Sequence, residues 1–221
     1  VAPPPDERDQ RTVVRIVLGV TGASGAAYAG HALRALTRSG VDVGLCVSDA
    51  GCQVIGHEVL GMPELPGPAR RDEVLTGFLG RYANAGGHVE VLDPGDLSCR
   101  FASGSSGAQA ALLAPCSMST LANVAHGTGS SLIHRAADVM LKERRPLVVV
   151  PRETPLSAIH LENMLALTRA GAVVLPAMPA LYTRPATVED MVDFVVSRAL
   201  DHLGVANALA PRWGATHGVH A

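Results

Sequence analysis

The fold is decided by residues 141–155, whose sequence is LKERRPLVVVPRETP. Residues 146–150 form an unbroken apolar and β-branched run, which is typical of a strand buried on both faces of a parallel sheet. Arg152 and Glu153 follow this run directly. Ligands of open α/β sheets bind beyond the carboxyl ends of the strands, so this pair is predicted to stand at a ligand site. The alternative is a surface ion pair beside a solvated helix end.

A second informative unit lies near the beginning of the chain. A strand pattern at 13–20 is followed by the turn TGASG at 21–25 and by a helical pattern at 26–39. Glycines allow backbone N–H groups to approach an anion, and a helix N-terminus favours negative charge. The turn is therefore a candidate phosphate site. It lacks the order G-x-G-x-x-G, so the dinucleotide fingerprint is not met, and a tight turn without a ligand is the alternative.

Strand and helix patterns alternate along most of the chain. This alternation predicts an α/β fold with a doubly wound, Rossmann-like (flavodoxin-like) parallel sheet in a single domain at residues 13–203. Residues 1–12 are predicted to be a disordered tail, and 204–221 a C-terminal tail that packs over the site or a neighbouring subunit. Further strands are expected at 41–47, 88–92, 110–114 and 172–175, and further helices at 49–59, 71–82, 120–125, 131–144, 157–170 and 188–203.

Composition narrows the function class. The chain has 221 residues and a net charge of −2, which argues against nucleic acid as a partner. Its four cysteines have no metal-binding spacing, so we expect reduced thiols and a cytoplasmic location. No apolar run reaches about 18 residues, so no membrane helix is expected.

Other polar residues have structural and functional readings that the sequence leaves open. Ser48 is either a helix N-cap or a ligand-binding residue, and Glu58 either a solvated helix residue or a functional carboxylate. The hydroxyl-rich loop at 102–107 could bind a phosphate or be a flexible linker. Arg135 and Lys142 are seven residues apart and lie on one helix face. Two cations placed in this way repel each other, which costs free energy unless an anion or a carboxylate lies near.

These pieces together resemble the UbiX-type flavin prenyltransferase family. The resemblance covers nearly the whole chain after residue 12, and 141–155 is its most specific part. Its motifs are TGASGAAY (21–28), ASGS (102–105), PCSMST (115–120), RAADVMLKERRPLVVVPRETP (135–155), HLENM (160–164) and PRW (211–213).

The resemblance implies a metal-independent transferase. It would join a dimethylallyl group from dimethylallyl monophosphate to N5 and C6 of reduced FMN, and supply the prenylated FMN to a UbiD-type decarboxylase. A homo-oligomer, specifically a dodecamer, is also implied.

The resemblance also assigns roles to individual residues. Ser24, Glu58 and Glu153 would transfer protons, Lys142 would also act in catalysis, and Trp213 would close over the site. The donor would be held by Ser105, Arg135, Lys142, Tyr182 and Arg198. The FMN site would comprise Gly22, Ala23, Ser24, Ser48, Ser117, Met118, Ser119, Thr120 and Arg152.

The proposed chemistry explains why cations are needed. Without a metal, a departing phosphate must be stabilised by fixed cations and hydrogen bonds. We therefore expect Lys142, Tyr182 and Arg198 to gather in one pocket beside the flavin. Two rivals share the fold: an FMN-dependent cysteine decarboxylase, and a flavin-storage or regulatory subunit without catalysis.

Overall fold

The computed structural model describes residues 14–84 and 86–212. In this part of the chain one sheet has six parallel strands in the order β3-β2-β1-β4-β5-β6. This order confirms the predicted doubly wound α/β sheet, with its topological switch point between β1 and β4. The strands are β1 (Arg15–Val20), β2 (Asp42–Val47), β3 (Val89–Leu92), β4 (Ala110–Cys116), β5 (Leu147–Pro151) and β6 (Val173–Val174).

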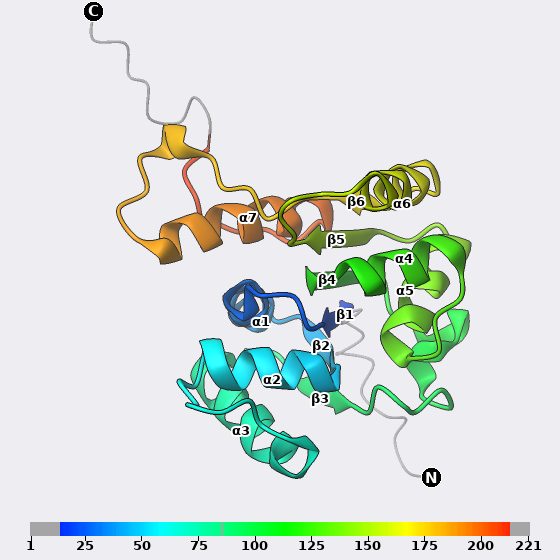
Figure 1. Ribbon diagram of the computed structural model, residues 1–221, viewed down its shortest axis with the longest axis horizontal. Helices are drawn as coiled ribbons and strands as arrows, with labels where there is room; N and C mark the ends of the chain where they lie inside the picture. Colours follow the sequence, from blue (N-terminus) through cyan, green and yellow to red (C-terminus); the bar gives the residue numbers. More distant parts are fainter. Residues whose placement is uncertain (1–13, 85, 213–221) are drawn as a thin grey trace, which may run out of the picture.

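Helices cover both faces of the sheet (Figure 1). The helices α1, α2, α3 and α7 share one core cluster with the sheet, and α4, α5 and α6 share the other. Their bounds are α1 (Ala26–Arg38), α2 (Asp49–Glu58), α3 (Arg71–Tyr82), α4 (Met118–His126), α5 (Leu132–Lys142), α6 (Ala158–Arg169) and α7 (Val188–His202).

The central strands are apolar throughout because both of their faces are covered. In β1, Ile16, Leu18 and Val20 face one cluster, and Val17 faces the other. β5 is buried at all five positions, as the run at 146–150 predicts. Burial on both faces removes the polar alternation of a half-exposed strand.

Hydroxyl side chains begin most of the helices that follow the strands. Ser48 accepts a hydrogen bond from the N–H of Gly51, and Ser117 accepts one from the N–H of Thr120. The N-cap reading of Ser48 is therefore confirmed. Ser131, Ser157 and Thr187 cap α5, α6 and α7 in the same way. Each such cap stabilises a helix by about 1 kcal/mol.

Several boundaries differ from the sequence-based prediction. β4 continues through Pro115 to Cys116, and α5 ends at Lys142 because Arg144 has a left-handed backbone (φ 56°). The loop at 102–107 includes a 3₁₀ turn at Gly104–Ser106, and the Gly104 carbonyl accepts a hydrogen bond from Arg145. The loop is thus tied to the end of α5.

One buried side chain joins the two strands at the switch point. The hydroxyl of Thr21, which is 2% exposed, donates to the Pro115 carbonyl at 2.9 Å. It also accepts the N–H of Ser117 at 2.8 Å. The Thr21 N–H donates to the same Pro115 carbonyl at 3.2 Å. These bonds fix the turn after β1 against the start of α4.

We predict that Thr21→Val lowers the free energy of unfolding by about 1–3 kcal/mol, because the partly buried N–H of Ser117 loses its acceptor. Urea unfolding measures the change. Thr168→Val is the matched control, since the Thr168 hydroxyl donates only to the Met164 carbonyl one helical turn earlier. Equal stabilities of the two variants would contradict the prediction.

Candidate functional site

The turn after β1 presents backbone at the carboxyl edge of the sheet. Gly22 and Ser24 are exposed, whereas Ala23 is buried. A Cβ atom at Gly22 would lie 2.6 Å from the Cβ of Ala50, so a larger residue would push α2 away. Gly25 has φ 112°, a conformation that side chains disfavour. The glycines therefore serve the close packing and bending of the turn.

The N-terminus of α1 is already occupied by a carboxylate. One oxygen of Glu58 accepts the N–H groups of Gly25 and Ala26 at 2.8 and 2.9 Å. Of the two alternatives for Glu58, the simple solvated helix residue is therefore ruled out, and the N–H groups of Gly25 and Ala26 are not open to a phosphate. The negative charge also complements the α1 dipole.

The N-terminus of α4 offers a second anion site. Ser117 caps Thr120, and the two hydroxyl oxygens are 3.1 Å apart. Within residues 14–84 and 86–212, no group accepts the N–H of Met118 or of Ser119. Two open N–H groups at a helix N-terminus can hold a phosphate.

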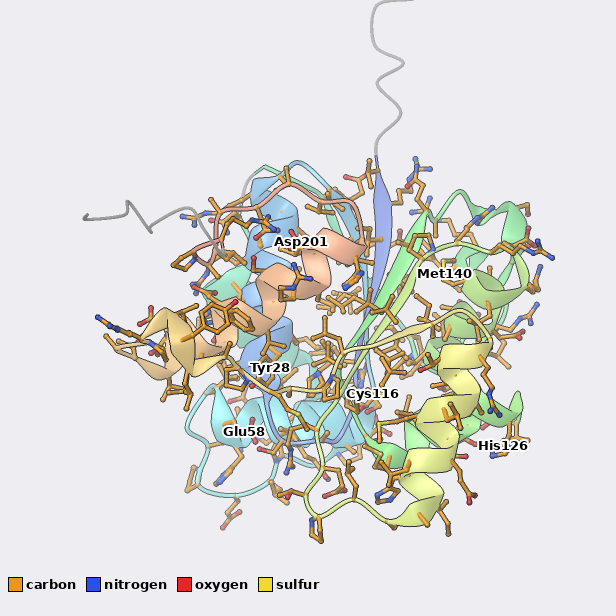
Figure 2. All side chains as sticks on the ribbon, turned by 90° about the horizontal axis from the view of Figure 1, so that it is seen from above. Tyr28, Glu58, Cys116, His126, Met140 and Asp201 are labelled. Carbon is orange, nitrogen blue, oxygen red and sulfur yellow. The ribbon has the colours of Figure 1, made fainter. Side chains whose placement is uncertain are left out.

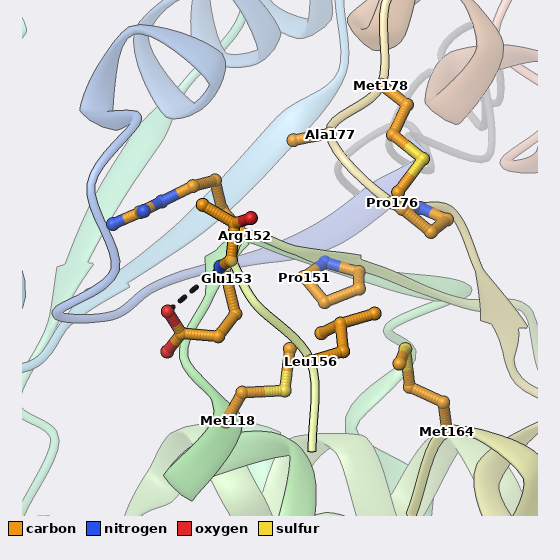
Figure 3. Close-up of a pocket in the computed structure, with 10 residues that line it drawn as sticks. Met118, Pro151, Arg152, Glu153, Leu156, Met164, Pro176, Ala177 and Met178 are labelled. Carbon is orange, nitrogen blue, oxygen red and sulfur yellow. Dashed lines mark hydrogen bonds between the residues drawn. The ribbon is translucent and has the colours of Figure 1, made fainter. Parts of the chain in front are cut away.

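Arg152 lies beside this helix and beside the turn after β1. Its Nε donates to the carbonyl of Ser24 at 3.1 Å, and its backbone N–H donates to the Cys116 carbonyl at 3.3 Å. A carboxylate oxygen of Glu153 accepts the N–H of Thr154 at 3.0 Å, which is the dashed line in Figure 3. Arg152 and Glu153 therefore form no ion pair with each other. The alternative of a surface ion pair does not hold for these two residues.

A pocket of about 270 Å³ lies at this edge of the sheet (Figure 3). It is mainly apolar, and sequence reasoning missed most of its lining. Residues 176–178 could have been found, because they closely follow the last strand. Met164 lies in the motif HLENM, but no role was assigned to it, and Leu156 carries no signal. The lining residues are Met118, Pro151, Arg152, Glu153, Thr154, Leu156, Met164, Pro176, Ala177 and Met178.

The lining of this pocket within one chain includes none of the predicted donor-binding residues. Lys142 precedes β5 whereas Arg152 follows it, and five strand residues span roughly 16 Å. Figure 2 places Met140, near the end of α5, and Cys116, at the end of β4, toward opposite ends of the strands. The order of elements along the chain is the physical reason for this separation.

Three of the predicted donor residues nevertheless belong to one region, on α5 and the neighbouring loop at 102–107. Arg135 donates to the carbonyl of Ala102 at 3.0 Å, and a Cβ at Gly104 would lie 2.9 Å from Nζ of Lys142. Ser105 is exposed on the same loop. The two cations that share a helix face each have a carboxylate partner: Asp138 pairs with Arg135, and Glu143 pairs with Lys142.

The remaining predicted donor residues belong to the segment leading into α7 and to α7 itself. Tyr182 is 55% exposed and contacts Phe194 edge-on, with ring centroids 6.0 Å apart. Arg198 lies ten residues into α7, about 15 Å from its start. Its guanidinium pairs with Asp201 at 2.8 Å.

Several other expectations concern the rest of the chain. Cys116 is fully buried, and burial raises its thiol pKa, which agrees with a packed thiol. No described group of three or more His, Cys, Asp or Glu side chains could hold a metal ion. None of the described helices combines the length and apolar content needed to cross a bilayer. Trp213 and the tail at 1–12 lie outside the described residues.

Comparison with known proteins identifies relatives over most of the chain. The flavoprotein family model matches residues 5–200. The flavin prenyltransferase UbiX of Pseudomonas aeruginosa is 46% identical over 187 residues, which are 84% of this chain and 87% of that protein.

Two solved structures are also similar. AnUbiX (PadA1), in complex with FMN and dimethylallyl pyrophosphate, is 39% identical with a TM-score of 0.75, covering 91% of this chain and 97% of that one. A dodecameric FMN-dependent UbiX-like decarboxylase from Escherichia coli O157:H7 is 38% identical with a TM-score of 0.73, covering 90% and 98%.

The fold, its strand-end site and these matches define the class: the chain belongs to the flavoprotein family. Its relatives across more than four fifths of its length are UbiX-type flavin prenyltransferases, which confirms the resemblance found in the sequence.

We predict that Glu58→Ala destabilises the protein by about 1 kcal/mol, because the N–H groups of Gly25 and Ala26 lose their acceptor. Glu58→Gln keeps an oxygen at this position and should cost less. Chemical unfolding without added flavin measures both variants. A Glu58→Ala protein as stable as the wild type would show that the cap has no structural role.

Proposed function

We propose that this protein is a flavin prenyltransferase that joins a dimethylallyl group to reduced FMN. The observation that carries the proposal is the site at the switch point. An open helix N-terminus and an arginine lie there beside a largely apolar pocket. FMN needs the same combination, because it has an anionic phosphate and a flat ring with apolar faces.

The residues at this edge fit FMN. The N–H groups of Met118 and Ser119, with the hydroxyls of Ser48, Ser117 and Thr120, would hold the phosphate. Gly22, Ala23 and Ser24 would line the ring together with Arg152, whose guanidinium is already fixed on the Ser24 carbonyl. The methionines of the pocket suit a polarisable aromatic ring.

We infer that the donor is dimethylallyl monophosphate and that the new bonds form at N5 and C6 of the flavin. The carbon–oxygen bond to the phosphate breaks, so the phosphate leaves with the electron pair. One donor and one reduced FMN give prenylated FMN and phosphate. The product would then serve as the cofactor of a UbiD-type decarboxylase.

Three residues around the turn after β1 are proposed to move protons. Glu153 lines the pocket directly after Arg152, and Arg152 is bonded to Ser24. Glu58 reaches the same turn through Gly25. Ring closure would require the prenyl double bond to take up a proton, C6 to bond to the resulting cation, and the C6 proton then to leave; we propose that Glu153 accepts it. Such acid–base help is worth roughly 10²–10⁴-fold in rate.

We further propose that the donor site is completed by a second copy of the chain. Ser105 and Lys142 are at the amino ends of the strands, away from Arg152, so one chain alone cannot bring them to the flavin. An oligomer can, and a dodecamer is proposed because the E. coli relative is dodecameric. Cations of the neighbouring copy, with Tyr182 and Arg198, would stabilise the leaving phosphate without a metal.

The sequence and the structure also bear on the cellular location and on the two rival functions. We propose that the protein is cytoplasmic, because its four cysteines are all free thiols. A cysteine decarboxylase would require a substrate clamp of its own, and a storage subunit would bind FMN without altering it. Both would release unmodified FMN.

The function is tested by anaerobic incubation with reduced FMN and dimethylallyl monophosphate, with and without a metal chelator. The released flavin should gain the mass of one prenyl unit and an altered absorption spectrum. Glu153→Gln should still bind FMN but form product at least 10²-fold more slowly, because its side chain cannot accept the proton. Unmodified flavin from the wild-type protein would refute the proposal.

The shared site predicts complementation between inactive variants. Lys142→Ala and Arg152→Ala should each abolish most activity, but co-expressed chains should assemble some sites in which both side chains are intact. Product formation by the mixed oligomer, compared with each variant alone, measures this. Activity no higher than the sum of the two variants would place both residues in one chain's site.

A further inference from the structure

The described part of the C-terminal segment, residues 204–212, is attached to α7. Val205 is 8% exposed in the core cluster that α7 shares with the sheet, and Leu209 packs against that cluster. The Asn207 amide donates to the Ser197 carbonyl at 3.3 Å, and its oxygen accepts the Ser197 hydroxyl at 2.7 Å. The segment is thus held on α7 by both apolar and polar contacts.

Asp201 is the point where this segment meets Arg198. Arg212 donates to both carboxylate oxygens, at 2.6 and 2.7 Å, which is a bidentate pair. Arg198 donates to the Oδ2 atom at 2.8 Å, and Asn207 donates to Oδ1 at 3.2 Å. The Asp201 side chain is only 19% exposed, whereas the two arginines are about half exposed.

The charges in this group do not cancel. Two guanidinium groups surround one carboxylate, so Arg198, Asp201 and Arg212 together carry a net charge of +1. The Arg212 hydrogen bonds hold the pKa of Asp201 below its usual range, so the carboxylate stays ionised at neutral pH. Because Arg212 occupies both oxygens, Arg198 shares only one of them and keeps donors for another anion.

We propose that Asp201 is a positioning residue that, together with Arg212, holds the Arg198 guanidinium ready for the phosphate of the prenyl donor. The inference rests on the proposed function, in which Arg198 binds that phosphate. Asp201 does not itself touch the donor. It fixes the arginine, and Arg212 limits how much of the arginine's charge the carboxylate neutralises.

The sign of the effect separates this proposal from simple charge neutralisation. If Asp201 only weakened the field of Arg198, its removal would tighten donor binding. If Asp201 positions Arg198, its removal leaves two adjacent cations that repel each other, and donor binding weakens. Loss of Arg212 should also weaken binding, because Asp201 can then pair with Arg198 alone.

The test measures the donor KM, kcat, FMN dissociation constant and melting temperature of four variants. We expect Asp201→Asn to raise the KM for dimethylallyl monophosphate about tenfold and Arg212→Ala about threefold, with FMN affinity unchanged. Arg212→Lys should recover most of the loss. Glu189→Gln, an exposed charge change on the same helix, is the control and should match the wild type.

Calorimetric binding of dimethylallyl monophosphate to the FMN-loaded protein provides a readout that does not need turnover. Tenfold weaker binding by Asp201→Asn supports the inference even if no prenylated FMN forms, in which case only the proposed reaction fails. An unchanged or tighter donor affinity in Asp201→Asn, an equal loss of FMN affinity, or no donor binding by the wild type would each overturn it.

Discussion

The site depends on the hydrogen bonds that the Thr21 side chain makes across the switch point. In a doubly wound sheet, the helix after β1 and the helix after β4 lie on opposite faces, so the chain leaves the two strand ends in opposite directions. Thr21 holds the two strand ends together by bonding to Pro115 and Ser117. The turn that carries Ser24 and the N-terminus of α4 are therefore fixed relative to each other. Arg152 adds a third connection, from β5 to the same turn.

The two halves of the proposed site are built differently. The flavin half is formed from strand ends and helix N-termini within one chain, where backbone groups are positioned by the sheet. The phosphate-donor half uses long cationic side chains on α5 and α7, each already paired with a carboxylate. Such pairs keep cations ordered at partly exposed positions, although each is individually weak. Assembly of chains would then bring an ordered cationic surface to a rigid flavin pocket.

The sequence predicted the parts of the structure that depend on local pattern. Unbroken apolar runs located β1, β4 and β5, and the strand-end rule placed Arg152 and Glu153 at the pocket. The bond from Glu58 to the start of α1 and the pairing of Arg212 with Asp201 could not be predicted, because each joins residues that only tertiary packing brings together. The separation of Lys142 from Arg152 could have been inferred, because one precedes β5 and the other follows it. The family resemblance instead assigned both residues to one site.

The carboxylate of Glu58 at the start of α1 also bears on which nucleotides the fold can accept. Sheets with this strand order commonly hold the pyrophosphate of NAD at the first helix of the sheet. In this chain that position is negatively charged, and a second anion there would be repelled. In the arrangement proposed above, a nucleotide with a single terminal phosphate would avoid this repulsion by binding at α4 instead. One side chain would then favour mononucleotides over dinucleotides on this fold.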